Sequence, residues 1–287
     1  MIIQILINGI LLGGVYGLIG LGFSIVWGVT SLINLAHGSL VILGAYISFW
    51  IFQYAHIDPF VSIPLVMLSL FIIGYLMQRY IFNLAIKADV FLTLIMTFGM
   101  DVLLAQLMIV MWSADWRSIA TSYQGKSLIF GGYLFPYTRL LGFVVALILT
   151  ILTAYFLDRT KTGQSIKAVA LDMMAARLMG VNPGKTYAIT FGIGASLAGA
   201  AGSLLAVMQS FNPAVGGGIT LRAFVVAILG GLGSVEGAFL GGIILGVIET
   251  FSAFYLGESF KNVVTFTLFV IILVTRPRGL LGKKYYG

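Results

Sequence analysis

The chain alternates long apolar stretches with short polar ones, and the apolar stretches have the length of membrane-spanning helices. An α-helix needs about 20 residues to cross a hydrocarbon core of roughly 30 Å. On this basis the sequence predicts spans over 5–29, 35–53, 60–77, 90–112, 137–157, 187–208 and 262–275. The predicted fold class is an all-α polytopic membrane protein. No linker, repeat or low-complexity segment divides it, so we expect residues 1–287 to form a single transmembrane domain.

Two more apolar segments, 221–233 and 237–255, precede the last span and are separated by the glycine-rich stretch GGLGSVEG. The first has 13 residues, and its helix would reach only roughly 20 Å. The sequence therefore predicts a broken or re-entrant helix here. The chain then crosses the membrane nine times with its N-terminus outside, or eight times with a re-entrant element, and both counts stay open. The break contains the candidate gating glycines Gly230, Gly231, Gly233 and Gly237.

The longest polar interruption, residues 159–186, predicts a helix outside the bilayer. Its composition favours a helix from Gln164 to Met179, with Gly180 as a left-handed C-cap. Such a helix is too short and too charged to span a membrane. Its apolar positions (Ile166, Ala170, Met173 and Met174) would either dock on a partner protein or lie among lipid headgroups.

Composition and charge agree with a membrane protein and add an orientation. The chain is 60% hydrophobic and only 9% charged, and it lacks the alternating segments of a transmembrane barrel. With alternating spans, 11 of the 16 Lys and Arg residues fall on the side of the 159–186 segment and the 276–287 tail. The positive-inside rule makes that side cytoplasmic. The net charge of +7 comes from basic residues in the loops, which set the orientation in the membrane. We therefore expect contact with membrane lipid and none with nucleic acid.

Motifs for catalysis or cofactor binding are missing from the sequence. There is no cysteine, no HExxH and no GxSxG. The stretch GVNPGKT at 180–186 resembles a phosphate-binding loop, but Met179 stands where its first glycine belongs, and it follows a helix rather than a strand. We expect no enzymatic activity, no metal and no cofactor on this chain.

A few polar residues fall inside the predicted spans and are candidates for a translocation pathway. Asn34 and His37 lie at the junction of the first two spans, where they belong either to a break at membrane depth or to a surface turn capped by Asn34. Asp101 interrupts the fourth span and should face the bundle, with Gln106 as a possible partner. The remaining candidates are Glu249 and Arg222, which could pair if the fold brings them together.

Small residues recur at four-residue spacing in three of the apolar segments. This spacing is typical of close helix–helix contacts, either within one subunit or across a dimer face. The residues concerned are Gly13 and Gly17, then Gly194, Ala198 and Gly202, then Ala238, Gly242 and Gly246.

Four stretches together resemble a known family. Residues 28–46, 163–182, 230–249 and 276–282 look like the first permease subunit of the branched-chain amino acid ABC importers. The resemblance implies a permease of the bacterial inner membrane that works with two ATP-binding subunits, a second related permease and a periplasmic or lipid-anchored binding protein. ATP and Mg would be bound by the partner subunits. The positions that it assigns to coupling with the ATPase are Lys167, Ala168, Asp172, Ala175, Ala176 and Gly180.

The implied mechanism is alternating access, in which ATP binding and hydrolysis by the partners reorient the spans. Some relatives that carry urea or short-chain amides have an acidic residue after the His-Gly pair, where this chain has Ser39, so the solute stays open. A stand-alone secondary transporter, with Asp101 or Glu249 binding a coupling ion, is the alternative from another class. Intramembrane enzyme chemistry is disfavoured by the missing catalytic residues.

Overall fold

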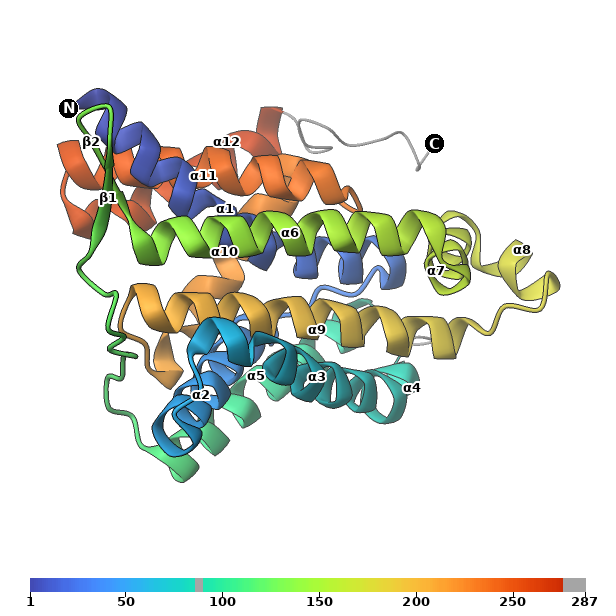
Figure 1. Ribbon diagram of the computed structural model, residues 1–287. Helices are drawn as coiled ribbons and strands as arrows, with labels where there is room; N and C mark the ends of the chain where they lie inside the picture. Colours follow the sequence, from blue (N-terminus) through green and yellow to red (C-terminus); the bar gives the residue numbers. More distant parts are fainter. Residues whose placement is uncertain (86–89, 276–287) are drawn as a thin grey trace.

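The computed structural model describes residues 1–85 and 90–275, which form a bundle of long helices (Figure 1). The basic tail 276–287, the closing motif 276–282 and Lys87 lie outside the described residues. The longest helices are α1 (Ile2–Thr30), α2 (His37–Ala55), α3 (Pro59–Met77), α5 (Val90–Trp112), α6 (Tyr137–Arg159), α9 (Pro183–Met208) and α11 (Val235–Tyr255).

The remaining elements are short. They are the π-helical turn η1 (Gln78–Phe82), α4 (Asn83–Ala85), strands β1 (Ser127–Phe130) and β2 (Tyr133–Pro136), α7 (Lys161–Leu171), α8 (Met173–Leu178), the 3₁₀ turn η2 (Pro213–Val215), α10 (Gly216–Gly230), the 3₁₀ turn η3 (Glu258–Phe260) and α12 (Lys261–Thr275). In the described part of the chain, eight helical segments are long and apolar enough to cross a membrane: the seven long helices, and the segment Pro213–Gly230 formed by η2 and α10 together. This confirms the all-α polytopic class.

The two ends of the bundle differ. At one end α7 and α8 project beyond the other helices, and at the other end lie the N-terminus and the β1–β2 hairpin (Figure 1). We call these the coupling end and the hairpin end. The amide of Gln4 near the start of α1 bonds the carbonyl of Leu134 in β2, so α1 runs from the hairpin end to the coupling end.

Helices α1 and α11 pack along their length through a seam of glycines. A Cβ on Gly242 would lie 2.1 Å from the backbone nitrogen of Gly17, and a Cβ on Gly246 would lie 2.4 Å from the Cα of Gly13. The two backbones are therefore in direct contact, as small-residue spacing predicts. Because these glycines are buried within the chain, the interpretation as a dimer face is wrong for them.

Helix α9 is the central helix of the bundle, and nearly all of its residues are buried. Its small residues admit neighbouring backbones on two sides. A Cβ on Gly194 would lie 2.7 Å from the carbonyl oxygen of Gly22 in α1, and one on Gly202 would lie 2.0 Å from that of Val41 in α2. The small-residue pattern of this helix also serves packing within the subunit.

The glycine-rich pair forms a half-helix and a full helix, with boundaries that differ from the prediction. Helix α10 occupies Gly216–Gly230 rather than 221–233, and its 15 residues reach roughly 22 Å. The turn that follows uses Gly231 and Gly233, whose φ angles of 90° and 76° favour glycine. Gly230 and Gly237 have another role, because a Cβ on either would strike the backbone of the other at 2.0–2.2 Å. They allow α10 and α11 to cross, and only two of the four candidate glycines break the helix.

The hairpin was missed from the sequence. Strands β1 and β2 pair antiparallel, with Phe130 opposite Tyr133, and the turn between them is Gly131–Gly132, both with positive φ. A double glycine between two short runs of aromatic and β-branched residues is a recognised hairpin signal. The signal was present in the sequence, between the predicted spans 90–112 and 137–157.

The predicted single helix from Gln164 to Met179 is wrong. The chain forms α7 and α8, which are separated at Asp172, where φ and ψ are −154° and 105°. Thr160 caps α7 by accepting a bond from the amide of Gly163, so the helix begins before Gly163. The carboxylate of Asp172 accepts bonds from the amides of Met174 and Ala175 and starts α8. Gly180 has φ 85°, as predicted for a left-handed position.

Candidate translocation and coupling sites

The connection between α1 and α2 enters the bundle instead of turning at its surface. His37, the first residue of α2, is fully buried, and its Nε2 lies 3.0 Å from the carbonyl oxygen of Ile19. Ile19 is 11 residues before the end of α1, so α2 begins roughly 16 Å from that end, measured along the helix. Asn34 is also buried, and its side chain accepts a bond from the amide of Ala36. The junction is therefore a break inside the bundle, and the interpretation as a surface turn is wrong.

The fourth predicted span contributes two polar side chains to the same place. The Ser39 hydroxyl donates to the Asp101 carboxylate at 2.5 Å, and the Thr97 hydroxyl donates to the carbonyl of Ile33 at 3.0 Å. Gln106, which we expected as a partner of Asp101, is exposed on the surface of α5. Asp101 therefore joins α5 to the start of α2, and the expected contact within α5 is not formed.

Helix α10 meets this break through a threonine that the sequence analysis missed. The Thr220 hydroxyl accepts a bond from the amide of Gly38 at 2.8 Å and donates to the carbonyl of Leu35 at 3.0 Å. A Cβ on Gly38 would lie 1.9 Å from the carbonyl of Gly216, so the starts of α2 and α10 touch. Two helices thus begin side by side inside the bundle, an arrangement typical of transporter sites. We call Asn34, His37, Ser39, Thr97, Asp101 and Thr220 the central polar cluster.

A second group of polar residues holds a buried charge. Glu249 is fully buried, and its carboxylate accepts bonds from the Arg222 guanidinium and the hydroxyls of Tyr16 and Thr265, each at 2.8 Å. The guanidinium also donates to Asn262. The structure thus brings together Glu249 and Arg222, as the sequence suggested. We call this group the charged cluster, and it ties α1, α10, α11 and α12 to one another.

Both clusters meet on α10. Thr220 belongs to the central polar cluster and Arg222 to the charged cluster, and the two residues are two positions apart on a short helix that ends in a glycine turn. A displacement of α10 would therefore disturb both clusters at once. The sequence signal for Thr220 was a hydroxyl two positions after three consecutive glycines, Gly216–Gly218, next to the segment 221–233 that was predicted to be too short to span the bilayer.

At the coupling end, α7 and α8 form an arm between α6 and α9 (Figure 1). Its tip is apolar and exposed: Leu178 and Met179 are each 85% exposed. Lys167 in α7 makes an ion pair with Asp158 in α6, while Asp172, Ala175 and Gly180 are exposed and Ala168 is partly buried. The arm therefore presents a small apolar surface beyond the end of the bundle.

Two residues expected on the docking face are not on it. Ala176 is buried against Val169 and Tyr187, where its small side chain lets α8 pack on α7 and α9. Ile166 is likewise buried and belongs to the main core. Burial within the chain leaves neither side chain accessible to a partner, so their expected place on this face is wrong. Met173 and Met174, which were expected on the same face, are exposed, together with Leu178 and Met179.

The stretch that resembles a phosphate-binding loop has an ordinary structural role. Asn182 caps α9 by accepting a bond from the amide of Lys185, and Pro183 is the first residue of that helix. Among the described residues, no three His, Asp or Glu side chains are grouped so that they could hold a metal ion.

These features define a class of protein. A multi-pass helical bundle with two helices that begin inside the bundle, a polar cluster between them and an apolar arm at one end has the architecture of a membrane transport permease. Residues 5–273 match the family described as the permease component of branched-chain amino acid transport systems. The chain belongs to this family.

Individual relatives agree along nearly the whole chain. It is 34% identical to the high-affinity branched-chain amino acid transport system permease protein BraD of Pseudomonas aeruginosa, over 98% of this chain and 96% of that protein. The corresponding protein LivH of Escherichia coli is 31% identical over the same shares. The related permease protein LivM of Escherichia coli is 26% identical over 93% of this chain and 68% of that protein.

One solved structure shows the same fold. A chain of PsaBC from Streptococcus pneumoniae, in complex with Fab, superposes with a TM-score of 0.51 and 17% identity, over 96% of this chain and 91% of that chain. At this identity the likeness concerns the fold alone.

Proposed function

We propose that the chain is the transmembrane subunit of an ATP-driven importer that carries branched-chain or related hydrophobic amino acids into a bacterial cell. The family and the printed names of its relatives support this solute class. The chain would lie in the inner membrane, with its coupling end and C-terminus in the cytoplasm, as the distribution of basic residues indicates.

The observation that carries the proposal is the arm. A helix pair with exposed Met174, Leu178 and Met179 at its tip sits outside the bundle and is joined at both ends to long helices, α6 and α9. Large apolar side chains gathered on a projecting surface mark a protein contact. An ATP-binding partner that grips this tip can move α6 and α9 as it closes and opens. Two such partners would bind ATP and Mg and supply the energy, and this chain would bind neither.

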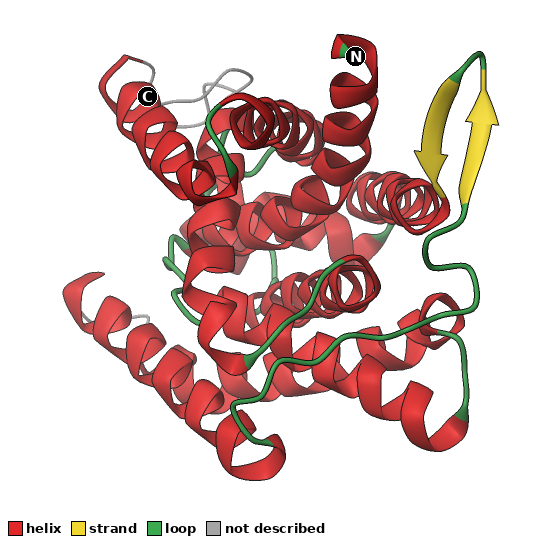
Figure 2. Ribbon diagram, turned by 90° about the vertical axis from the view of Figure 1, so that its left-hand side faces the viewer, coloured by secondary structure: helices red, strands yellow, loops and turns green. Residues whose placement is uncertain are grey.

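The solute would pass along the side of the bundle on which α5 exposes its side chains. Helix α5 exposes large apolar side chains such as Phe98 and Leu103 together with the amide of Gln106. In the end-on view α5 and α12 lie apart on one side of the molecule (Figure 2). A polar side chain at bilayer depth is costly against lipid, which favours a protein neighbour, and a second, related permease is the partner that we propose here. The central polar cluster would then face the path between the two permeases.

The mechanism we propose is alternating access. A binding protein, free in the periplasm or anchored to lipid, delivers the solute to the hairpin end. Nucleotide binding closes the two motor subunits and opens the path outward, and hydrolysis resets it inward. The half-helix α10 is the element that we propose to move, because it ends at Gly230 before a glycine turn and joins the central polar cluster to the charged cluster through Thr220 and Arg222.

The test is uptake by the complete complex reconstituted in proteoliposomes, with labelled leucine, isoleucine and valine, and with urea and acetamide as competitors. We expect leucine uptake that needs ATP and the binding protein and is insensitive to ionophores. Competition by urea or acetamide alone would assign the importer to the amide-carrying relatives. Uptake that survives ATP depletion and collapses with the membrane potential would contradict the proposal and favour an ion-coupled transporter.

A further inference from the structure

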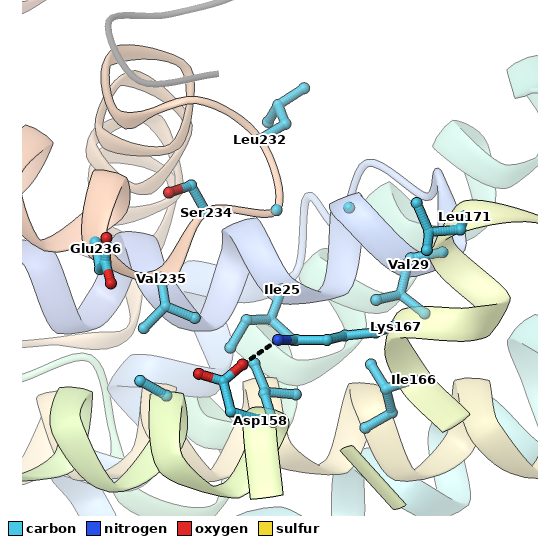
Figure 3. Close-up of a pocket in the computed structure, with 15 residues that line it drawn as sticks. Ile25, Val29, Asp158, Ile166, Lys167, Leu171, Leu232, Ser234, Val235 and Glu236 are labelled. Carbon is cyan, nitrogen blue, oxygen red and sulfur yellow. Dashed lines mark hydrogen bonds and ion pairs between the residues drawn. The ribbon is translucent and has the colours of Figure 1, made fainter. Parts of the chain in front are cut away.

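A cavity of about 250 Å³ lies at the coupling end, outside both polar clusters (Figure 3). Its wall comes from four parts of the chain: the end of α1, the end of α6, the helix α7 of the arm, and the turn between α10 and α11. The volume is just below the about 300–1,000 Å³ typical of sites for drug-sized ligands. It suits a smaller molecule.

Charges of both signs line this cavity. Lys167 reaches from α7 to Asp158 on α6 and forms an ion pair there (Figure 3). Glu236, in the first turn of α11, lines the cavity as well and is exposed. Two carboxylates and one ammonium leave a net charge of −1 on the lining. This balance disfavours free anions such as fatty acids or phosphates, and it favours a ligand that brings an ammonium group together with a carboxylate.

The rest of the lining is aliphatic. Ile25, Leu157 and Ile166 are buried in the core and also line the cavity, together with Val29 and Val235. An aliphatic side chain placed here would lose its contact with water, which contributes about 0.8 kcal/mol for each buried methylene group. The cavity therefore offers both an apolar pocket and a pair of opposite charges for a small molecule.

We propose that this cavity binds an aliphatic α-amino acid in its zwitterionic form, from the side of the membrane on which the arm lies. The ammonium group would be held by Glu236 and Asp158, the carboxylate by Lys167, and the side chain by the aliphatic lining. This inference rests on the proposed function, since it makes the imported solute itself the ligand.

The position of the cavity gives binding a regulatory effect. The lining joins the arm, through Ile166 and Lys167, to the glycine turn that ends α10, through Gly233 and Val235. A ligand that bridges the two keeps the arm in its present position relative to α10. Suppose that the ligand binds only this conformation of the protein. At ten times its dissociation constant it then raises the population ratio of this conformation to the others about elevenfold. The accumulated product would then slow further import by about tenfold.

Two variants change the cavity and leave the proposed transport path as it is. Ala154 lines the cavity from α6, so Ala154→Phe fills it without changing a charge. Glu236→Gln keeps the shape and removes one carboxylate, and it is the second variant should the larger side chain prevent folding. The matched control is Leu152→Phe, on the same helix but 55% exposed on the surface and outside the cavity lining.

The experiment uses the full complex in proteoliposomes whose ATP-binding subunits face outward, with the binding protein and labelled leucine inside. ATP is added outside, and export of label and ATP hydrolysis are followed while unlabelled leucine is added outside. We expect both rates to fall by about tenfold when outside leucine reaches ten times its dissociation constant. Glycine, isocaproate and isoamylamine, which lack the side chain, the ammonium and the carboxylate respectively, should leave both rates unchanged. Glu236→Gln should need about tenfold more leucine, Ala154→Phe should abolish the effect, and Leu152→Phe should retain it.

Leucine-dependent transport that outside leucine does not slow, or slows equally in Ala154→Phe, would overturn the inference while leaving the proposed function intact. A complex that moves urea and not leucine would instead contradict the proposed function. In that case, equilibrium binding of labelled leucine to the detergent-solubilised complex, without the binding protein, tests whether the cavity binds leucine. Binding that Ala154→Phe abolishes supports the site, and no binding, or binding unchanged by Ala154→Phe, overturns it.

Discussion

The seam between α1 and α11 and the arm formed by α7 and α8 are built in opposite ways. In the seam, glycines bring two backbones into direct contact over about two helical turns, from Gly9 to Gly17 of α1, as at Gly17 and Gly242. In the arm, two short helices hold together through the small buried cluster of Val169, Ala176 and Tyr187, and Leu178 and Met179 are left exposed. The first arrangement resists relative motion, while the second can move with a partner. The comparison separates the rigid part of this permease from the part that receives force.

The largest effect is expected from removing the Arg222 guanidinium, which forms an ion pair with Glu249 of the seam helix α11. Arg222→Met leaves a fully buried carboxylate without its ion-pair partner, and the free energy of unfolding should fall by about 3–5 kcal/mol. Thermal unfolding of the purified protein in detergent measures this. The double variant Arg222→Met with Glu249→Gln should recover part of the loss. Equal stability of the single and double variants would mean that the carboxylate does not depend on Arg222.

A smaller loss is expected from one added methyl group in the seam. Gly242→Ala places a Cβ about 2.1 Å from the backbone nitrogen of Gly17, so α1 and α11 must separate, at a cost of about 1–3 kcal/mol in the free energy of unfolding. The control is Gly99→Ala in α5, where a Cβ meets nothing within 4 Å and stability should be kept or gained. If both variants unfold alike, the glycines are not what holds the seam.

In the arm, a comparable change should have a local effect only. Asp172→Ala removes the side chain that accepts bonds from the amides of Met174 and Ala175, a cap contribution of about 1 kcal/mol. Hydrogen exchange at 174–178 should speed up about fivefold, while the unfolding temperature of the bundle is unchanged. Asp172→Asn, which can still cap the helix, is the control. A lowered unfolding temperature in Asp172→Ala would show that the arm is part of the rigid body.

Most of the fold could be predicted from the sequence, because membrane spans follow from length and hydropathy alone. The positions that failed depend on contacts between distant segments. Nothing local shows that Ala176 would turn inward, because this follows from the break at Asp172 and from Tyr187 on another helix. The depth of His37 depends on Ile19 in α1, and the partner of Asp101 proved to be Ser39 rather than Gln106. Thr220 was overlooked because a hydroxyl in a helix usually bonds its own backbone, and its second bond to the Leu35 carbonyl shows only in three dimensions.

The central claim is that an ATP-binding partner grips the tip of the arm. It is tested by Leu178→Asp and Met179→Asp in the reconstituted complex, with Leu178→Met as the control. Both side chains are 85% exposed, so the substitutions should leave the unfolding temperature of the bundle unchanged. We predict that ATP-driven leucine uptake then falls roughly tenfold or more, because apolar anchors dominate the energetics of a protein interface. Uptake at the normal rate with these charges in place would contradict the account.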